Sequence, residues 1–294
     1  MSAADTLFPG FATRRIATSG AEIACVIGGN GPPLLLLHGY PQTHAMWHRV
    51  APRLAERFTV VCSDLRGYGD SAKPAGGERH VNYSKRAMAL DQVELMRALG
   101  FERFNLAGHD RGGRVAHRLT LDHAECVQKL AVLDISPTRI MYGRTDQAFA
   151  TAYYHWFFLI QRFDLPERLI GADPIYYLHK KIGGWSRGMS YFDPRALTEY
   201  ERCFTPAMIH ASCEDYRAAA GIDLEHDAQD SGKRVECPLL AIWGDEGVVN
   251  RLFRPLDDWG SVARDVRGRA LHSAHFLAEE APDETLDELM RFFG

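Results

Sequence analysis

Short apolar runs alternate with amphipathic stretches in the first half of the chain, and this pattern constrains the fold more than any other feature. Amphipathic stretches such as Ser84–Leu99 and Gly113–Asp122 separate runs that end in loops rich in Gly, Asp or His. The runs are Leu34–Leu37, Phe58–Cys62, Phe104–Leu106 and Leu130–Leu133. Short, wholly apolar strands between helices are typical of a mostly parallel sheet with helices on both faces. We therefore predict an α/β fold.

The alternation stops between residues 139 and 229. This segment contains no strand-like run, and stretches such as Tyr153–Ile160 are helical in pattern and rich in aromatic residues. The strand pattern resumes at Leu239–Trp243. We predict that residues 1–138 and 230–294 form the two parts of one core domain, with residues 139–229 inserted between them as a helical cap.

Charge and cysteine content exclude several classes of protein. The 294 residues include 34 Lys+Arg and 38 Asp+Glu, a formal charge of −4, so we expect no nucleic-acid or membrane partner. The longest aliphatic run, Leu34–Leu37, is too short to span a bilayer, and Met1–Arg15 lacks the apolar stretch of a secretory signal. The six cysteines are scattered and form no CxxC pair, which favours buried thiols in a reducing compartment. We expect a cytoplasmic protein.

The string Gly108-His109-Asp110-Arg111-Gly112 follows a strand-like run directly and precedes a helical one. It has the form Gly-x-nucleophile-x-Gly, in which small residues permit a tight strand-to-helix turn that exposes the central side chain. The helix start also supplies amide N–H groups that stabilise negative charge. Here the central residue is Asp110, and a carboxylate can displace a leaving group from saturated carbon to form an ester. The alternative is an ordinary helix-capping aspartate.

Together with this elbow, three further motifs make the chain resemble the α/β-hydrolase superfamily over nearly its whole length. His38-Gly39-Tyr40-Pro41 resembles the oxyanion loop, and Asp64-Leu65-Arg66-Gly67-Tyr68-Gly69-Asp70-Ser71 resembles the loop after the next strand. Ala274-His275-Phe276 resembles the segment that carries the catalytic histidine. An aspartate in the elbow narrows the resemblance to haloalkane dehalogenases, epoxide hydrolases and fluoroacetate (haloacetate) dehalogenases.

Two arginines favour the last of these families. Haloalkane dehalogenases and epoxide hydrolases usually place Trp after the nucleophile, where this chain has Arg111, and Arg114 lies one helical turn from Asp110. Guanidinium groups suit recognition of a carboxylate, so a substrate with its own carboxylate is expected. The string His109-Asp110-Arg111-Gly112-Gly113-Arg114 resembles fluoroacetate dehalogenases closely. The alternative is that both arginines pair only with surface acids.

The resemblance also implies a base and an acid that orients it. His275 is the candidate base that activates water, with His272 as its rival. Many members of the superfamily carry the acid at the position of Gly247, and glycine cannot orient an imidazole. The fluoroacetate dehalogenase arrangement places the acid at Asp134, which we favour over Asp245.

Stabilisation of the leaving halide and of the oxyanion is likewise implied by the resemblance. His155, Trp156 and Tyr216 match the halide-binding residues of fluoroacetate dehalogenases, although an aromatic stripe is more often the core of a cap. The backbone N–H groups of Tyr40 and Arg111 are the candidate oxyanion donors.

The resemblance implies a hydrolase that converts fluoroacetate and water to glycolate and fluoride through an ester on Asp110, which water activated by His275 hydrolyses. It implies a small haloacid as the partner, no cofactor, no metal, and a possible homodimer. One alternative is an epoxide hydrolase, in which Tyr154 and Tyr216 would protonate the epoxide oxygen. A further alternative is a non-catalytic ligand receptor on the same fold.

Overall fold

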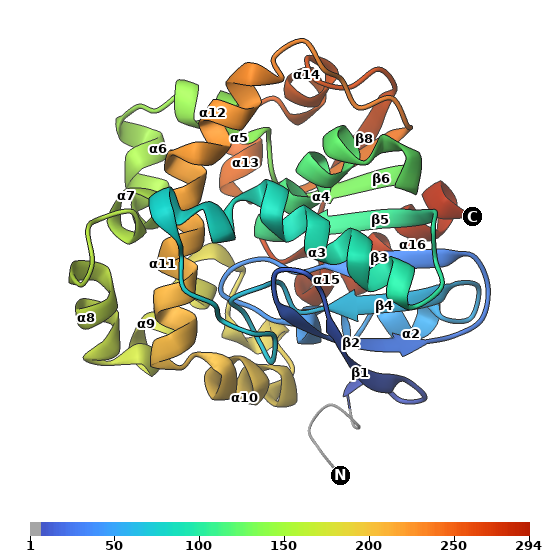
Figure 1. Cartoon of the computed structure of the whole chain (residues 1–294), viewed down its shortest axis with the longest axis horizontal. Coiled ribbons are helices and arrows are strands. Elements are labelled where there is room, and N and C mark those ends of the chain that lie inside the picture. The colour runs from blue at the N-terminus through green and yellow to red at the C-terminus, as the bar shows by residue number, and fades with distance from the viewer. Residues whose placement is uncertain (1–6) are drawn as a thin grey trace.

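A computed structural model describes residues 7–294 and contains one eight-stranded sheet (Figure 1). The strands are β1 (Ala12–Ala17), β2 (Glu22–Gly28), β3 (Pro33–Leu37), β4 (Thr59–Ser63), β5 (Phe104–His109), β6 (Val127–Leu133), β7 (Leu239–Gly244) and β8 (Val266–Leu271). Their order across the sheet is β1-β2-β4-β3-β5-β6-β7-β8, and every pair from β4 to β8 is parallel. The predicted mostly parallel α/β sheet is confirmed.

The strands that the sequence pattern did not predict lie mainly at the edges of the sheet. β1 and β2 form an antiparallel pair at one edge, and β8 forms the other edge. β1 is mostly exposed, and β8 has only one buried residue, so neither needs the continuous apolar run that marks a buried central strand.

Helices of the core cover both faces of the sheet. The long helices α3 (Lys85–Ala98) and α4 (Arg111–Asp122) pack together on one face, and α2 (Ala51–Leu54) and α16 (Pro282–Phe293) lie on the other (Figure 1). The remaining short helices, which follow β7 and β8, are α13 (Val248–Leu252), α14 (Pro255–Gly260) and α15 (Leu277–Glu280). The sandwiched sheet holds its strand ends rigidly in place, which matters because the candidate site residues follow those ends.

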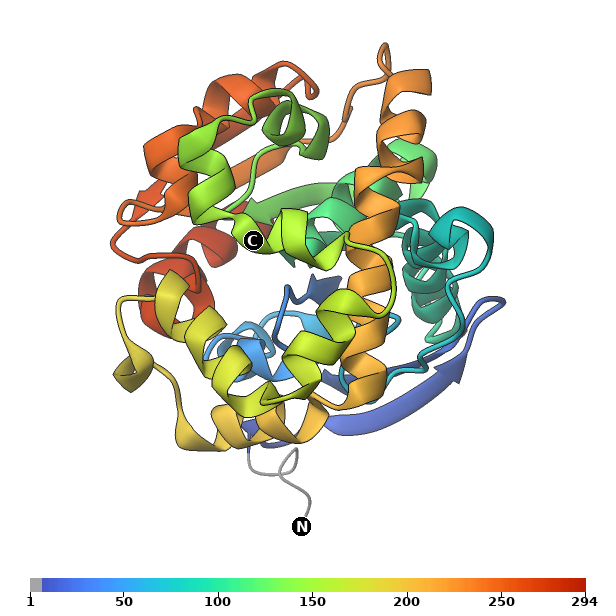
Figure 2. The same ribbon diagram turned by 90° about the vertical axis from the view of Figure 1, so that its left-hand side faces the viewer.

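Between β6 and β7 the chain forms helices and no strand. They are α5 (Thr138–Gly143), α6 (Gln147–Ala152), α7 (Tyr154–Leu159), α8 (Leu165–Gly171), α9 (Pro174–Trp185), α10 (Pro194–Cys203), α11 (Pro206–Ala220) and α12 (Ile222–Gln229). This helical layer lies to the left of the sheet in Figure 1, and Figure 2 looks onto it. It corresponds to the predicted insertion, whose limits of 139 and 229 stay a prediction.

No helix in the described range 7–294 is long and apolar enough to cross a bilayer. All six cysteines are free and five are buried, as the sequence predicts. Residues 1–6, part of the segment that we inspected for a secretory signal, lie outside the described residues.

The glycines of the elbow between β5 and α4 are required by close packing. A Cβ atom on Gly112 would lie 2.4 Å from the backbone oxygen of His38, and one on Gly108 would lie 2.5 Å from the oxygen of Gly112. A Cβ atom on Gly39 would lie 2.6 Å from that of Asp110. Side chains at these positions would force the oxyanion loop and the elbow apart.

We therefore expect Gly112→Ala to lower the free energy of unfolding by about 1–3 kcal/mol, because the new methyl group meets backbone that cannot rotate away. The matched control is Gly143→Ala, in α5, where a Cβ atom meets nothing within 4 Å and should be neutral or stabilising by about 0.5 kcal/mol. Chemical denaturation measures both. Equal stabilities for the two variants would show that the elbow does not need its glycine.

Candidate active site

The candidate catalytic residues all follow the carboxyl ends of parallel strands. Tyr40 comes after β3, Asp110 after β5, Asp134 after β6 and His275 after β8. Because these strands lie side by side in the order β3, β5, β6, β7 and β8, their carboxyl ends meet along one edge of the sheet. The sheet therefore brings together residues that are up to 235 positions apart in the chain.

Asp110 stands at the apex of the elbow with its backbone in the left-handed region, at a φ of 45°. It is the residue before α4, yet its side chain accepts no capping hydrogen bond from that helix, which excludes the role of an ordinary helix cap. Instead, Oδ2 accepts from the backbone N–H of Tyr40 at 3.0 Å. Burial alone would raise the pKa of Asp110, but the positive charges of His275 and Arg114 outweigh it and lower that pKa, so the carboxylate is ionised.

His275 is hydrogen-bonded to Asp134, with 2.6 Å between Nδ1 and Oδ2, and both side chains are buried. The other oxygen of Asp134 accepts from the backbone N–H of Gly244 at 3.1 Å. Burial opposes the charged imidazole, but the hydrogen bond and charge of Asp134 outweigh it and raise the pKa of His275. Since Nδ1 donates to Asp134, Nε2 of the neutral ring is free to accept a proton, and it has no partner within the described chain.

Two contacts from neighbouring residues hold His275 in place. Its backbone N–H donates to the carbonyl oxygen of Trp185 at 3.0 Å, and its own carbonyl oxygen accepts from Nε2 of His109 at 2.8 Å. Burial lowers the pKa of His109 to about 3, so that ring is neutral and serves as a fixed donor. Sequence reasoning overlooked both His109 and Trp185.

The rival residues lie elsewhere. Asp245 and His272 are exposed and contact each other, with 3.4 Å between Oδ2 and Nδ1. Together with Glu246 they place three potential metal ligands within 4.8 Å of one another. Because all three side chains are exposed, a solvated surface ion-pair cluster explains them equally well, and we assign no metal there.

The two arginines differ in their surroundings. Arg111 is paired with the buried carboxylate of Asp215, and burial alone would lower its pKa, but this pairing raises it. Arg114 has no carboxylate within ion-pair distance in the described range, and burial lowers its pKa. Its guanidinium group contacts the carbonyl oxygen of Ser136 at 3.3 Å and the hydroxyl of Thr138 at 2.8 Å. Neither arginine pairs with a surface acid.

The three candidate halide donors are buried without acceptors. Both ring nitrogens of His155, Nε1 of Trp156 and the hydroxyl of Tyr216 have no hydrogen-bond partner within residues 7–294. The Tyr216 ring lies under the guanidinium group of Arg111 at 4.2 Å, and that of Trp156 under Arg114 at 4.7 Å. Buried donors normally find a partner, so this group of unsatisfied donors indicates a site for an anion.

The cap side of the site also contains a buried lysine. Nζ of Lys181 lies 3.7 Å from the centre of the Trp185 ring, and burial lowers the pKa of Lys181 to about 7. Burial and the charge of Lys181 together lower the pKa of His155 well below its ordinary value. His155 is therefore neutral and can give an anion a single N–H donor.

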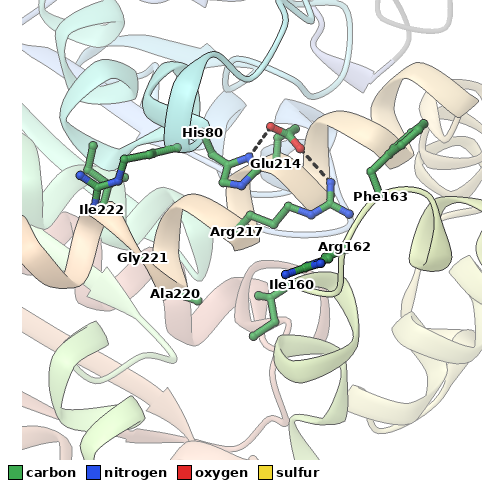
Figure 3. Close-up of a pocket in the computed structure, with 10 residues that line it drawn as sticks. His80, Ile160, Arg162, Phe163, Glu214, Arg217, Ala220, Gly221 and Ile222 are labelled. Carbon is green, nitrogen blue, oxygen red and sulfur yellow. Dashed lines mark hydrogen bonds and ion pairs between the residues drawn. The ribbon is translucent and has the colours of Figure 1, made fainter.

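Two cavities bear on where a ligand could bind. A small cavity of about 120 Å³ lies beside Asp134, Trp185 and His275. A larger one, of about 500 Å³, opens beside α11, away from these residues (Figure 3). Its Glu214 accepts from Arg217 at 2.8 Å and lies 2.6 Å from Nδ1 of His80, so its charges satisfy one another. The small cavity adjoins Asp134 and His275, but its lining does not include Asp110, the two arginines or the candidate halide donors.

Comparison with known proteins shows the family of the chain. A family model for the alpha/beta hydrolase fold matches residues 32–281. A fluoroacetate dehalogenase of a Burkholderia species is 50% identical over 290 residues, covering 98% of this chain and 95% of that protein. A soluble epoxide hydrolase of Corynebacterium sp. (strain C12) is 35% identical over 94% of this chain and 95% of its own. The solved structure of a protein with the alpha/beta hydrolase fold from Nostoc sp PCC 7120 is 58% identical, with a TM-score of 0.95 over 96% of this chain and 98% of that one. The resemblance predicted from the motifs is confirmed.

Because Asp134 is what raises the pKa of His275, we expect Asp134→Asn to lower that pKa. An NMR titration of the imidazole signals measures the shift. Asp245→Asn, which removes an exposed carboxylate from the surface cluster, is the control and should leave the pKa of His275 unchanged. If Asp245→Asn moved it and Asp134→Asn did not, the orienting acid would be Asp245.

Proposed function

This chain belongs to the alpha/beta hydrolase family and is a relative of fluoroacetate dehalogenase, and we propose that it hydrolyses short 2-halocarboxylates, with fluoroacetate as the leading substrate. The products would be glycolate, a halide ion and a proton. A homodimer and a cytoplasmic location stay predictions.

In the first step the carboxylate of Asp110 displaces the halide. Its Oδ2 accepts from Tyr40, so Oδ1 is the oxygen left to attack the C2 carbon in line with the carbon–halogen bond. The new C–O bond gives an alkyl ester, and the halide leaves with the bonding electrons toward the donors of His155, Trp156 and Tyr216. The substrate carboxylate would bind the guanidinium groups of Arg111 and Arg114.

In the second step water hydrolyses the ester. Nε2 of His275 takes a proton from water, which attacks the carboxyl carbon of Asp110, and the resulting oxyanion is stabilised by the N–H groups of Tyr40 and Arg111. Asp134 stabilises the imidazolium that forms. When the intermediate collapses, the bond between the Asp110 carbon and the alkyl oxygen breaks, and His275 returns its proton to that leaving oxygen. The carboxyl group of Asp110 then loses the second proton of the water, which is the proton released as a product, and the carboxylate is restored.

One observation carries the proposal: within residues 7–294, Arg114 is a buried cation without a carboxylate in an ion pair, and Asp110, the candidate nucleophile, is buried nearby. A neutral substrate would leave that cation uncompensated whenever Asp110 is alkylated, whereas a haloacid supplies its own carboxylate at that moment. The unsatisfied donors of the cap support the proposal, because they suit a small, strongly accepting anion.

Epoxide hydrolysis is the second candidate, supported by the 35% identical relative and by the buried, unpaired hydroxyl of Tyr216. The other tyrosine considered for that role is Tyr154. It is 47% exposed, which suits a side chain that must donate a proton to a bound epoxide poorly. The uncompensated charge of Arg114 argues against a neutral substrate. Asp110, Asp134 and His275 together also argue against a receptor without catalytic activity.

We expect the purified protein to release fluoride from fluoroacetate, as measured with a fluoride electrode, and to leave styrene oxide unchanged by chromatography. The physical reason is the buried positive charge of Arg114, which favours an anionic substrate. Diol formation without fluoride release would identify an epoxide hydrolase, and activity on neither compound would overturn the proposed function.

We expect His275→Asn to release about one equivalent of halide per site and then stop, because displacement by a carboxylate needs no base but hydrolysis of the ester does. Mass spectrometry should find a carboxymethyl group on the peptide that carries Asp110. The control is His272→Asn, which should turn over within about twofold of the unmodified protein, because His272 is exposed and contacts Asp245 rather than Asp134. A folded His275→Asn protein that forms no adduct would contradict the two-step mechanism.

A further inference from the structure

The two arginines of the candidate site are held in different ways, and this difference has a consequence for substrate selection. Arg111 makes a bidentate pair with Asp215, with Nε 2.8 Å from Oδ2 and Nη2 2.7 Å from Oδ1. Nη2 also donates to the carbonyl oxygen of Asp215 at 3.0 Å. Both residues are almost completely buried, at 1% and 0% exposed. Arg114, by contrast, contacts only uncharged groups, and its Nε has no partner within residues 7–294.

Asp215 is the centre of a charge-balanced network. Besides Arg111, it accepts from the hydroxyl of Tyr68 at 2.7 Å and forms an ion pair with Lys85. Lys85 also lies 3.6 Å from a carboxylate oxygen of Asp223. Two buried cations therefore face two buried carboxylates. This network adds no net charge to the site, although Arg111 belongs to it.

On the basis of the proposed function, we propose that Asp215 is a positioning residue that neutralises Arg111 and fixes its guanidinium group, so that Arg114 supplies the net positive charge that selects an anionic substrate. Arg111 then acts as a fixed hydrogen-bond donor through Nη1, which no hydrogen bond engages in the described part of the chain. The sequence motif that contains Arg111 and Arg114 does not distinguish these two roles.

The geometry around Arg111 explains why it needs such a fixed position. Asp215 accepts hydrogen bonds from Nε and Nη2 of the guanidinium group. The ring centre of the next residue, Tyr216, lies 4.2 Å from the central carbon of that group. Both residues lie on α11 of the helical insertion, whereas Arg111 opens α4 of the core. The pair thus holds an arginine of the core, from two directions, beside the halide donor Tyr216. Small displacements of such a donor would misalign the substrate carbon with Asp110.

The first test separates charge from position by binding of acetate and acetamide, which have the same shape but lack a leaving group. Isothermal titration calorimetry gives both dissociation constants without turnover. We expect Arg114→Met to weaken acetate binding by about 10- to 150-fold, the loss of one charge-assisted contact, and to change acetamide binding much less. The matched control is the double variant Arg111→Met with Asp215→Asn, which removes one charge of each sign. Because Arg111 is itself a proposed donor, this variant should bind both ligands more weakly, but its preference for acetate over acetamide should stay within about threefold of that of the unmodified protein.

The second test concerns position. We expect Asp215→Asn to lower kcat for fluoroacetate by about 10- to 100-fold without weakening acetate binding, because Arg111 is released while the net positive charge increases. The matched control is Asp223→Asn, which removes a buried carboxylate from the same lysine but not from Arg111. It should lower stability in chemical denaturation and leave kcat within about twofold. A purely structural role for Asp215 would give both variants the same pattern.

Two results would overturn the inference. One is an equal loss of acetate preference in Arg114→Met and in the double variant, and the other is a folded Asp215→Asn protein with unchanged kcat. Failure of the proposed function looks different, because the unmodified protein would then release no fluoride while the acetate and acetamide titrations still report on the arginines. An unmodified protein that does not prefer acetate to acetamide would overturn the division of roles directly.

Discussion

Asp110 must carry a negative charge while only 3% of its surface is exposed, and the groups around it together offset the cost of removing that charge from water. The N–H of Tyr40 donates to one oxygen, and the charges of His275 and Arg114 lower the pKa of the carboxyl. A nucleophile that is ionised but poorly solvated is more reactive than one surrounded by water. A conformation in which those groups moved away would leave the charge of Asp110 buried without compensation. The geometry of the site and the stability of its strand ends are therefore coupled.

The candidate site is built from two parts of the chain: residues that follow strands of the sheet, and residues of the helical insertion. Asp110, Asp134 and His275 follow strands of one sheet, and two of them, Asp110 and Asp134, adopt left-handed backbone conformations with φ values of 45° and 49°. Such strain persists only where the surrounding structure determines it, here the ends of the neighbouring strands β5 and β6. The candidate halide donors His155 and Tyr216 come from the helical insertion instead. Chemistry and leaving-group recognition can therefore vary independently within this fold.

Uncharged hydrogen-bond donors suit both the stabilisation of a leaving halide and its release. A cation in direct contact would bind the product ion strongly and slow its release, whereas the neutral His155 ring, the Trp156 indole and the Tyr216 phenol stabilise charge only by hydrogen bonds. In the proposed function, the positive charge lies instead at Arg114, where the substrate would keep its carboxylate throughout the reaction. The proposed role of Arg111 is consistent with this division. Paired with Asp215, Arg111 can still donate a hydrogen bond but adds no second net positive charge to the site.

Local patterns in the sequence predict the fold class and name the candidate site residues. Continuous apolar runs marked the buried central strands, and Gly108-x-Asp110-x-Gly112 marked the elbow, since only small residues tolerate contacts as close as those of Gly112. These signals are local, because burial and tight turns limit which residues a short segment can contain. The exposed edge strands β1 and β8 escaped notice, because an edge strand needs no apolar run.

Tertiary structure decided which long-range partners these groups have. The family resemblance favours Asp134 over Asp245, but only the folded chain shows Asp134 hydrogen-bonded to His275 and Asp245 at the surface with His272. The pairing of Arg111 with Asp215 was equally hidden, although Asp215 directly precedes Tyr216 in the sequence. Charges that are 104 or 141 residues apart interact through distance and burial, and neither quantity is written in local sequence.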